Sequence, residues 1–282
     1  MKIGIIGYGN LGKAFVKGLV STGFNQNDIV INAKTKKTRD SIGNDFNDVY
    51  VTANKEELVN KSDVIILIIE PMNAKEVLNE IKAYNINQKI IISFMAGITM
   101  AEIRNELGEK QNAVKLIRVM PNIAIQEGNG VLGITYNDSD YEIIQDVLNV
   151  LRRLGYVLKL DETSLNYITV TAASGLAFAA CIMDSYQAAC NTLLNNNNIS
   201  KEITIRIFEN VVDMVKNEDC SLNDIVCRIT TKGGTTEAGM NILDAKLVTE
   251  NLVACMHKSF ERANNIIWFL INYRKSFALF TN

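Results

Sequence analysis

Two glycines followed by two threonines, Gly233-Gly234-Thr235-Thr236, form the part of the sequence best suited to binding a small anion. Glycines let the backbone turn tightly, and the start of a helix leaves N–H groups free to bind a carboxylate. A threonine hydroxyl beside that anion can donate a hydrogen bond to a neighbouring nitrogen or oxygen. The segment predicts either a loop that holds a small amino or imino acid by its carboxylate, or an ordinary helix start.

A dinucleotide-binding pattern stands near the first residue. The apolar run Lys2–Ile6 leads into the sequence G-Y-G-N-L-G at Gly7–Gly12, and a helical pattern follows. In this G-x-G-x-x-G motif we expect Gly7 to make the tight turn, Gly9 to let the pyrophosphate approach the backbone, and Gly12 to let the helix pack on the strand. The sequence therefore predicts nucleotide binding at this turn.

Short apolar runs alternate with helical patterns up to about residue 160. We expect strands at Lys2–Ile6, Ile29–Ile31, Val49–Val51, Val64–Ile69, Lys89–Ser93, Val114–Val119 and Val131–Thr135. The run Val64–Ile69 is apolar at every position, as in a strand covered by helices on both faces. This alternation predicts an α/β domain with a mostly parallel, doubly wound sheet over residues 1–160, with nucleotide bound at the carboxyl ends of the strands.

Helical periodicity takes over in the second half, residues 161–282. We expect helical segments at 163–193, 200–215, 221–229, 235–250 and 251–271. No proline follows Pro121, which suits long helices, and Ala172–Cys190 is rich in small residues that let helices approach closely. The pattern predicts a compact all-α domain.

Composition narrows the classes of function. The net charge of −2 favours neither nucleic acid nor an anionic membrane as a partner. Five cysteines without C-x-x-C spacing indicate free thiols, the apolar run Ile266–Ile271 is too short to span a bilayer, and no signal peptide is visible, so we expect a cytoplasmic protein. The single histidine, His257, is expected on the surface, which leaves no histidine-based metal site.

The second strand bears on the choice between NADH and NADPH. It ends in Asn32 rather than in the acidic residue that binds a ribose 2′-hydroxyl. The segment Lys34–Arg39 then supplies four cations and two threonines, which favours NADPH because cations accept a 2′-phosphate. The alternative is a solvated lysine-rich turn.

Taken together, these motifs resemble those of pyrroline-5-carboxylate reductases, which make proline by reducing a cyclic imine. The resemblance covers residues 1 to about 265. It is carried by Gly7–Gly12, by Arg118–Asn122 with Gly128 and Gly130, by Ser174–Ala177, and by Gly233–Thr236 with Ala238, Gly239, Leu243 and Asp244. It implies a Rossmann-type domain followed by an all-α dimerisation domain, with NADPH (NADH being possible), an imino-acid substrate, and a homodimer or a larger homo-oligomer built on dimers. In this family each active site joins one chain's nucleotide domain to helices of its partner.

The resemblance also implies roles for individual residues. The cofactor would be bound by Gly7, Gly9, Asn10, Leu11 and Gly12 at the pyrophosphate, by Asn32, Lys34 and Thr35 around the adenosine ribose and its phosphate, and by Met120, Pro121 and Asn122 beside the nicotinamide. Substrate would be bound by Ser174 and Gly175 and, at its carboxylate, by the backbone of Gly233, Gly234 and Thr235. The hydroxyl of Thr236 would hydrogen-bond the ring nitrogen as the catalytic contact.

Several positions depart from the family pattern. Glu70 replaces a lysine before Pro71, Ile123 and Ala124 replace Thr-Pro after Asn122, Leu176 replaces a proline, and Lys232 replaces the proline before the paired glycines. The alternatives are therefore a reductase for another imine or keto acid, and a nucleotide-sensing regulatory protein. Retention of Gly233–Thr236 favours catalysis.

The reaction expected of the family also fits the side chains present. Related hydroxyacid dehydrogenases carry a proton-donating lysine on the corresponding helix, whereas Ala172–Cys190 contains none. A cyclic imine can be protonated before hydride arrives, so the enzyme needs orientation and one hydrogen bond, which Thr236 can provide. Asp184 is expected either to orient the threonine loop or to lie on the helix surface.

Overall fold

The computed structural model of the protein describes residues 1–282 except 109–113, 219, 244 and 279–282. Two compact units are present: Met1–Ala173 together with the chain from Ser259, and Ser174–Lys258. The predicted domain boundary at residue 160 follows the last strand of the sheet. That boundary stays a prediction, and the last four residues of the tail Lys275–Asn282 lie outside the described residues.

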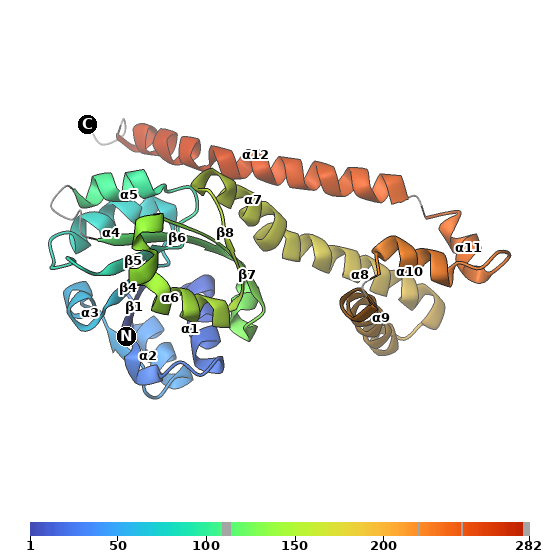
Figure 1. Cartoon of the computed structure of the whole chain (residues 1–282), viewed down its shortest axis with the longest axis horizontal. Coiled ribbons are helices and arrows are strands. Elements are labelled where there is room, and N and C mark those ends of the chain that lie inside the picture. Colours follow the sequence, from blue (N-terminus) through green and yellow to red (C-terminus); the bar gives the residue numbers. More distant parts are fainter. Residues whose placement is uncertain (109–113, 219, 244, 279–282) are drawn as a thin grey trace. The chain divides into compact units, whose positions relative to one another are not determined.

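The first unit is built on one sheet of eight strands within the described residues (Figure 1). Its strands are β1 (Ile3–Ile6), β2 (Ile29–Asn32), β3 (Tyr50–Thr52), β4 (Val64–Leu67), β5 (Ile90–Ser93), β6 (Lys115–Pro121), β7 (Gly130–Tyr136) and β8 (Gly155–Lys159). They are ordered β3-β2-β1-β4-β5-β6-β7-β8, and every pair is parallel except β6–β7. The predicted doubly wound α/β sheet is confirmed. Its strand order changes direction at β1 and β4, which places a crevice for a ligand at their carboxyl ends.

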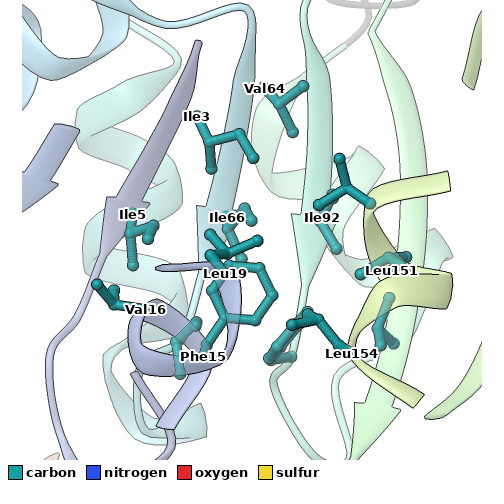
Figure 2. Close-up of a cluster of buried hydrophobic side chains, with 14 of the residues drawn as sticks. Ile3, Ile5, Phe15, Val16, Leu19, Val64, Ile66, Ile92, Leu151 and Leu154 are labelled. Atoms are coloured by element: carbon teal, nitrogen blue, oxygen red, sulfur yellow. The ribbon is translucent and has the colours of Figure 1, made fainter. Parts of the chain in front are cut away.

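Helices cover both faces of this sheet (Figure 1). They are α1 (Asn10–Ser21), α2 (Lys36–Asp45), α3 (Lys55–Lys61), α4 (Ala74–Ile81), α5 (Met100–Leu107), α6 (Tyr141–Arg153) and α7 (Leu165–Ile168). The face packed against α1 and α6 buries Phe15, Leu19 and Leu151 against strand residues such as Ile5 and Ile66 (Figure 2). Every residue of β1, β2, β4 and β5 is buried, which explains why these strands are apolar at nearly every position.

One strand was not predicted. β8 pairs with β7 at the edge of the sheet, and Tyr156 on it is 65% exposed. An edge strand with one solvated face has a weak apolar pattern, and the five residues Gly155–Lys159 fall between two helical patterns. The predicted strands and the observed ones otherwise agree to within a few residues at each end.

Helices follow β8, as predicted. The segment from Glu162 to Leu194 is helical throughout: a short 3₁₀ turn (Glu162–Ser164) leads into α7, a π-helical stretch (Thr169–Ser174) and α8 (Gly175–Leu194). α9 (Asn197–Glu218), α10 (Leu222–Ile229) and α11 (Thr235–Met240) lie in the second unit, and α12 (Ala245–Ala278) begins there.

The predicted division between helices at residues 250 and 251 is wrong. α11 ends at Met240, and α12 runs without a break from Ala245 to Ala278. No glycine or proline occurs after Gly239, so nothing in the later sequence interrupts a helix. The break between α11 and α12 instead follows Met240, which lies between Gly239 and Asn241.

A buried arginine joins β6 to the start of the helices. Arg118 is 4% exposed, and its Nη1 lies 2.7 Å from Oε1 of Glu162. The same carboxylate oxygen accepts a 2.7 Å bond from the backbone N–H of Met100, at the start of α5. Glu162 therefore neutralises Arg118 and holds α5 at once.

We expect Glu162→Ala to lower the free energy of unfolding by roughly 2–4 kcal/mol, because it leaves a buried guanidinium without its carboxylate. Glu162→Gln keeps an acceptor for Met100 and should lose less. Urea unfolding at one fixed protein concentration measures the change, with Glu142→Ala on the exposed face of α6 as the matched control. If both alanine variants unfold at the same urea concentration, the pair contributes no stability.

Candidate functional site

The turn between β1 and α1 has the geometry that the glycine motif requires. Gly7 has φ +105°, and a Cβ atom there would lie 2.1 Å from the carbonyl oxygen of Ile68. A Cβ on Gly12 would lie 2.5 Å from the carbonyl oxygen of Gly7, which explains why the helix can approach the strand only with glycine there.

Gly9 differs from these two glycines. A Cβ atom on Gly9 would meet no atom of the described residues within 4 Å, so their packing does not require glycine at this position. Gly9 is the N-cap of α1 and makes no side-chain cap bond, which leaves the first N–H groups of the helix, at Asn10 and Leu11, open toward an anion. The open space over Gly9 fits the approach of a pyrophosphate.

A cavity of about 360 Å³ adjoins this turn, at the carboxyl ends of β1 to β4. It is lined by Ile6, Gly7, Tyr8, Asn32, Ala33, Lys34, Thr35, Thr38, Ala53, Lys55, Ile69, Asn73, Glu76 and Val77. Gly7, Asn32, Lys34 and Thr35 were predicted as cofactor residues, and the structure brings them together here. Lys36 and Lys37, from the same basic run, are exposed and do not line the cavity.

Hydrogen bonds fix the basic turn that borders the cavity. The hydroxyl of Thr35 caps α2 by accepting from the N–H of Thr38 (3.1 Å), and the Arg39 guanidinium donates to the carbonyl oxygens of Ala33 and Lys34, each at 2.9 Å. The amide of Asn32 donates to the carbonyl oxygen of Thr52 (3.2 Å). Lys34 is thus an exposed cation on a rigid turn.

Tyr8 is a lining residue that sequence reasoning did not single out. Its hydroxyl oxygen is buried and has no hydrogen-bond partner within the described residues. Burial, and then the nearby carboxylate of Asp45, raise the pKa of Tyr8 to about 12, so the hydroxyl stays protonated and able to donate. An orphaned donor at a cavity wall fits a polar ligand. Its position between Gly7 and Gly9 was the only signal in the sequence.

The residues predicted beside the nicotinamide lie at the end of β6. Met120 is buried in a small apolar cluster with Leu165 and Ile168. The amide of Asn122 is also buried: it donates to the carbonyl oxygen of Ala172 (3.2 Å) and accepts from the N–H of Val131 (3.2 Å). The structure therefore gives the Asn122 side chain a role in holding the π-helical stretch on the sheet.

Two of the residues that depart from the family pattern follow directly. Ile123, which is 50% exposed, and Ala124 begin the 3₁₀ turn Ile123–Glu127, which packs on α1. A Cβ atom on Gly18 of α1 would lie 2.2 Å from the carbonyl oxygen of Ile125, so a glycine is needed at the contact. The turn is held against α1 without the proline of the family pattern.

Ser174 and Gly175 lie where the π-helical stretch passes into α8, within the segment 163–193 that was predicted to be helical. π-Helical turns interrupt the regular hydrogen bonding of a helix and often occur at functional sites. On α8 itself Asp184 is exposed, and His257 is exposed on α12. The described residues gather no group of three histidine, cysteine or acidic side chains that could hold a metal ion.

The glycine–threonine loop begins α11, as predicted. Gly233 has φ +75°, which favours glycine, and Gly234 is the N-cap of the helix. Two of its predicted carboxylate donors are already used. The N–H of Gly233 donates to Oε2 of Glu237 (2.8 Å), and the N–H of Gly234 donates to the carbonyl oxygen of Thr231 (2.9 Å). The N–H of Thr235, at the first helical position, has no partner inside the helix.

The glycine turn, the cavity beside it and the helices after β8 define a Rossmann-type dinucleotide-binding protein with an all-helical second part. Residues 2–97 match the family model described as NADP oxidoreductase, coenzyme F420-dependent, and residues 162–266 match the model described as pyrroline-5-carboxylate reductase dimerisation.

Individual relatives are similar in sequence to this protein over nearly the whole chain. The pyrroline-5-carboxylate reductase of Aquifex aeolicus is 27% identical over 271 residues, which are 94% of this chain and 97% of the relative. That of Staphylococcus haemolyticus is 28% identical over 277 residues (94% and 99%). Among solved structures, the Plasmodium falciparum pyrroline carboxylate reductase with NADP bound has a TM-score of 0.82 at 21% identity, covering 95% of this chain and 98% of that one. The chain is thus similar to pyrroline-5-carboxylate reductases along nearly its whole length, and its helical part matches their dimerisation domain.

Proposed function

We propose that the chain reduces L-1-pyrroline-5-carboxylate to L-proline with NADPH. The observation that carries this proposal is the match of relatives named for that activity along 97–99% of their length. The chain also keeps both motifs that the activity needs, the glycine turn at Gly7–Gly12 and the loop at Gly233–Thr236. A nucleotide sensor would need only the first of them.

We propose a binding position on the chain for each part of the cofactor. The open N–H groups at the start of α1 would hold the pyrophosphate, and the cavity beside Asn32, Lys34 and Thr35 would hold the adenosine end. Met120 and Pro121 end β6 on the nicotinamide side. When bound, the nicotinamide supplies the hydride for the reduction, which amino-acid side chains cannot provide.

The loop at the start of α11 would bind the substrate. Because the N–H groups of Gly233 and Gly234 bond within the protein, we propose that the N–H groups of Thr235 and Thr236 receive the carboxylate. The Thr236 hydroxyl oxygen would accept a hydrogen bond from the protonated ring nitrogen. The imine carbon gains a hydride and the nitrogen keeps the proton it already carries, so the reaction needs orientation and no separate acid.

We propose that NADPH is preferred through Lys34 and not through the whole basic run. Lys34→Ala should raise the KM for NADPH roughly five- to tenfold and leave the KM for NADH within about twofold, because only NADPH carries the 2′-phosphate. Lys36→Ala is the matched control, since Lys36 lies outside the cavity lining. Steady-state rates with both cofactors decide the matter. Equal changes for the two lysines, or for the two cofactors, would show a solvated turn.

We propose that the chain forms a homodimer, or a larger assembly built on dimers. Among the described residues, one helical segment, Glu162–Leu194, is long enough to cross a membrane and contains an 18-residue window with a mean hydropathy of 1.5. It begins the part matched by the dimerisation model, and α8 within it contains no buried residue in the single chain. We therefore propose that a second copy, and not lipid, covers these side chains.

We also propose a cytoplasmic location. The five cysteines are free, in keeping with a cytoplasmic protein.

The proposal is tested by oxidation of NADPH on addition of L-1-pyrroline-5-carboxylate, with proline measured as the product. Reduction of another imine or keto acid with no proline formed would favour a changed substrate. Binding of NADPH without turnover of any of them would favour a sensor.

A further inference from the structure

A glutamate braces the loop that begins α11. Oε2 of Glu237 accepts a 2.8 Å hydrogen bond from the N–H of Gly233, four residues earlier. Gly233 precedes the N-cap residue, Gly234, and Glu237 lies in the first turn of the helix. The bond therefore closes a ring that contains Gly234, Thr235 and Thr236.

This ring matters because Gly233, where the loop turns, has little else to hold it. Paired glycines lose more conformational freedom on ordering than any other residues. In the part of the chain that the structure describes, a Cβ atom on Gly233 would meet no atom within 4 Å, so side-chain packing does not fix that residue. Two other backbone bonds involve Gly234: its N–H donates to the carbonyl oxygen of Thr231 (2.9 Å), and its own carbonyl oxygen accepts from the N–H of Ala238 (3.2 Å), as the first bond of α11. Neither of them holds Gly233, the residue that the Glu237 carboxylate binds.

We infer that Glu237 is a positioning residue: its bond to Gly233 holds the loop in the conformation that presents Thr235 and Thr236 to substrate. The inference rests on the proposed function. Glu237 does not touch substrate; it lowers the cost of ordering the loop when substrate binds, so it acts on substrate affinity and not on the chemical step. The bond needs an acceptor and not a charge, so glutamine can replace glutamate.

A competing role makes the opposite prediction. If the Glu237 carboxylate occupied a donor that the substrate carboxylate needs, its removal would free the Gly233 N–H and lower the KM. If it braces the loop, its removal raises the KM. The sign of the change separates the two.

The experiment compares Glu237→Ala, Glu237→Gln and the control Glu202→Ala, which removes an exposed glutamate paired with Arg206 on α9. We expect Glu237→Ala to raise the KM for pyrroline-5-carboxylate roughly five- to tenfold, with kcat and the KM for NADPH within about twofold. Glu237→Gln and Glu202→Ala should stay within about twofold of the wild type. An unchanged or lower KM in Glu237→Ala, or no recovery in Glu237→Gln, would overturn the inference.

Hydrogen exchange at the Gly233 amide gives a readout that does not depend on turnover. Exchange should be slow in the wild type and in Glu237→Gln, and roughly tenfold faster in Glu237→Ala. A wild type that does not reduce pyrroline-5-carboxylate contradicts the proposed function, while the exchange rates still decide whether Glu237 holds the loop. Equal exchange in all the variants would overturn the inference even in an active enzyme.

Discussion

Thr236→Ala is expected to lower kcat/KM for pyrroline-5-carboxylate roughly ten- to a hundredfold, while NADPH binds almost as before. The proposed function gives the Thr236 hydroxyl the one side-chain hydrogen bond to the ring nitrogen, and such a bond to a charged group contributes about 1.5–3 kcal/mol. The sole histidine, His257, is exposed on α12, and we do not expect it to replace the hydroxyl. The segment Ala172–Cys190 contains no lysine that could do so.

Two further variants locate the effect within the loop. Thr236→Ser keeps the hydroxyl and should recover most of the activity. Thr235→Ala should lose less than Thr236→Ala, because the proposal uses the backbone N–H of Thr235 and not its hydroxyl. Steady-state kinetics together with NADPH binding measure both. Wild-type rates in Thr236→Ala, or a greater loss in Thr235→Ala, would contradict this assignment of roles.

Alanine at Gly9 and alanine at Gly7 are expected to fail in different ways. The space over Gly9 is free of protein atoms, so Gly9→Ala should fold normally. Its methyl group would stand where the pyrophosphate approaches, and we expect NADPH affinity to fall roughly ten- to a hundredfold. Fluorescence titration with NADPH measures the affinity.

Gly7→Ala acts on folding instead. Its φ of +105° disfavours any other residue, and the new Cβ would stand 2.1 Å from the carbonyl oxygen of Ile68. We expect the free energy of unfolding to fall by roughly 2–4 kcal/mol. Thermal unfolding of the two variants side by side checks the contrast. A destabilised Gly9→Ala, or a Gly9→Ala that binds NADPH like the wild type, would contradict the proposed place of the pyrophosphate.

The sheet could be predicted because a strand that is buried on both faces has an almost continuous apolar sequence. β1, β2, β4 and β5 are apolar at nearly every position, and each was predicted to within about two residues. β8 was missed because one of its faces is solvated, which weakens its apolar pattern. The length of α12 was predicted wrongly because its sequence was divided at residues 250 and 251, although no helix-ending residue stands there.

The candidate site was predictable only in part, for a physical reason. Motifs identify which backbone groups are able to bind a ligand, but not which of them the protein already uses. Ligand contacts were expected from the N–H groups of Gly233 and Gly234 and from Asn122. In the structure, these groups make hydrogen bonds within the protein instead. Likewise, a run of cations cannot show that Lys34 borders the cavity while Lys36 does not.

Hydride transfer to the imine carbon is the central claim, and deuterium labelling tests it most directly. The protein would be incubated with L-1-pyrroline-5-carboxylate and NADPH that carries deuterium at the transferable position of the nicotinamide. Mass spectrometry should find proline with one deuterium, on the ring carbon that was the imine carbon. Proline without deuterium, or no proline while labelled NADPH is bound, would contradict the account.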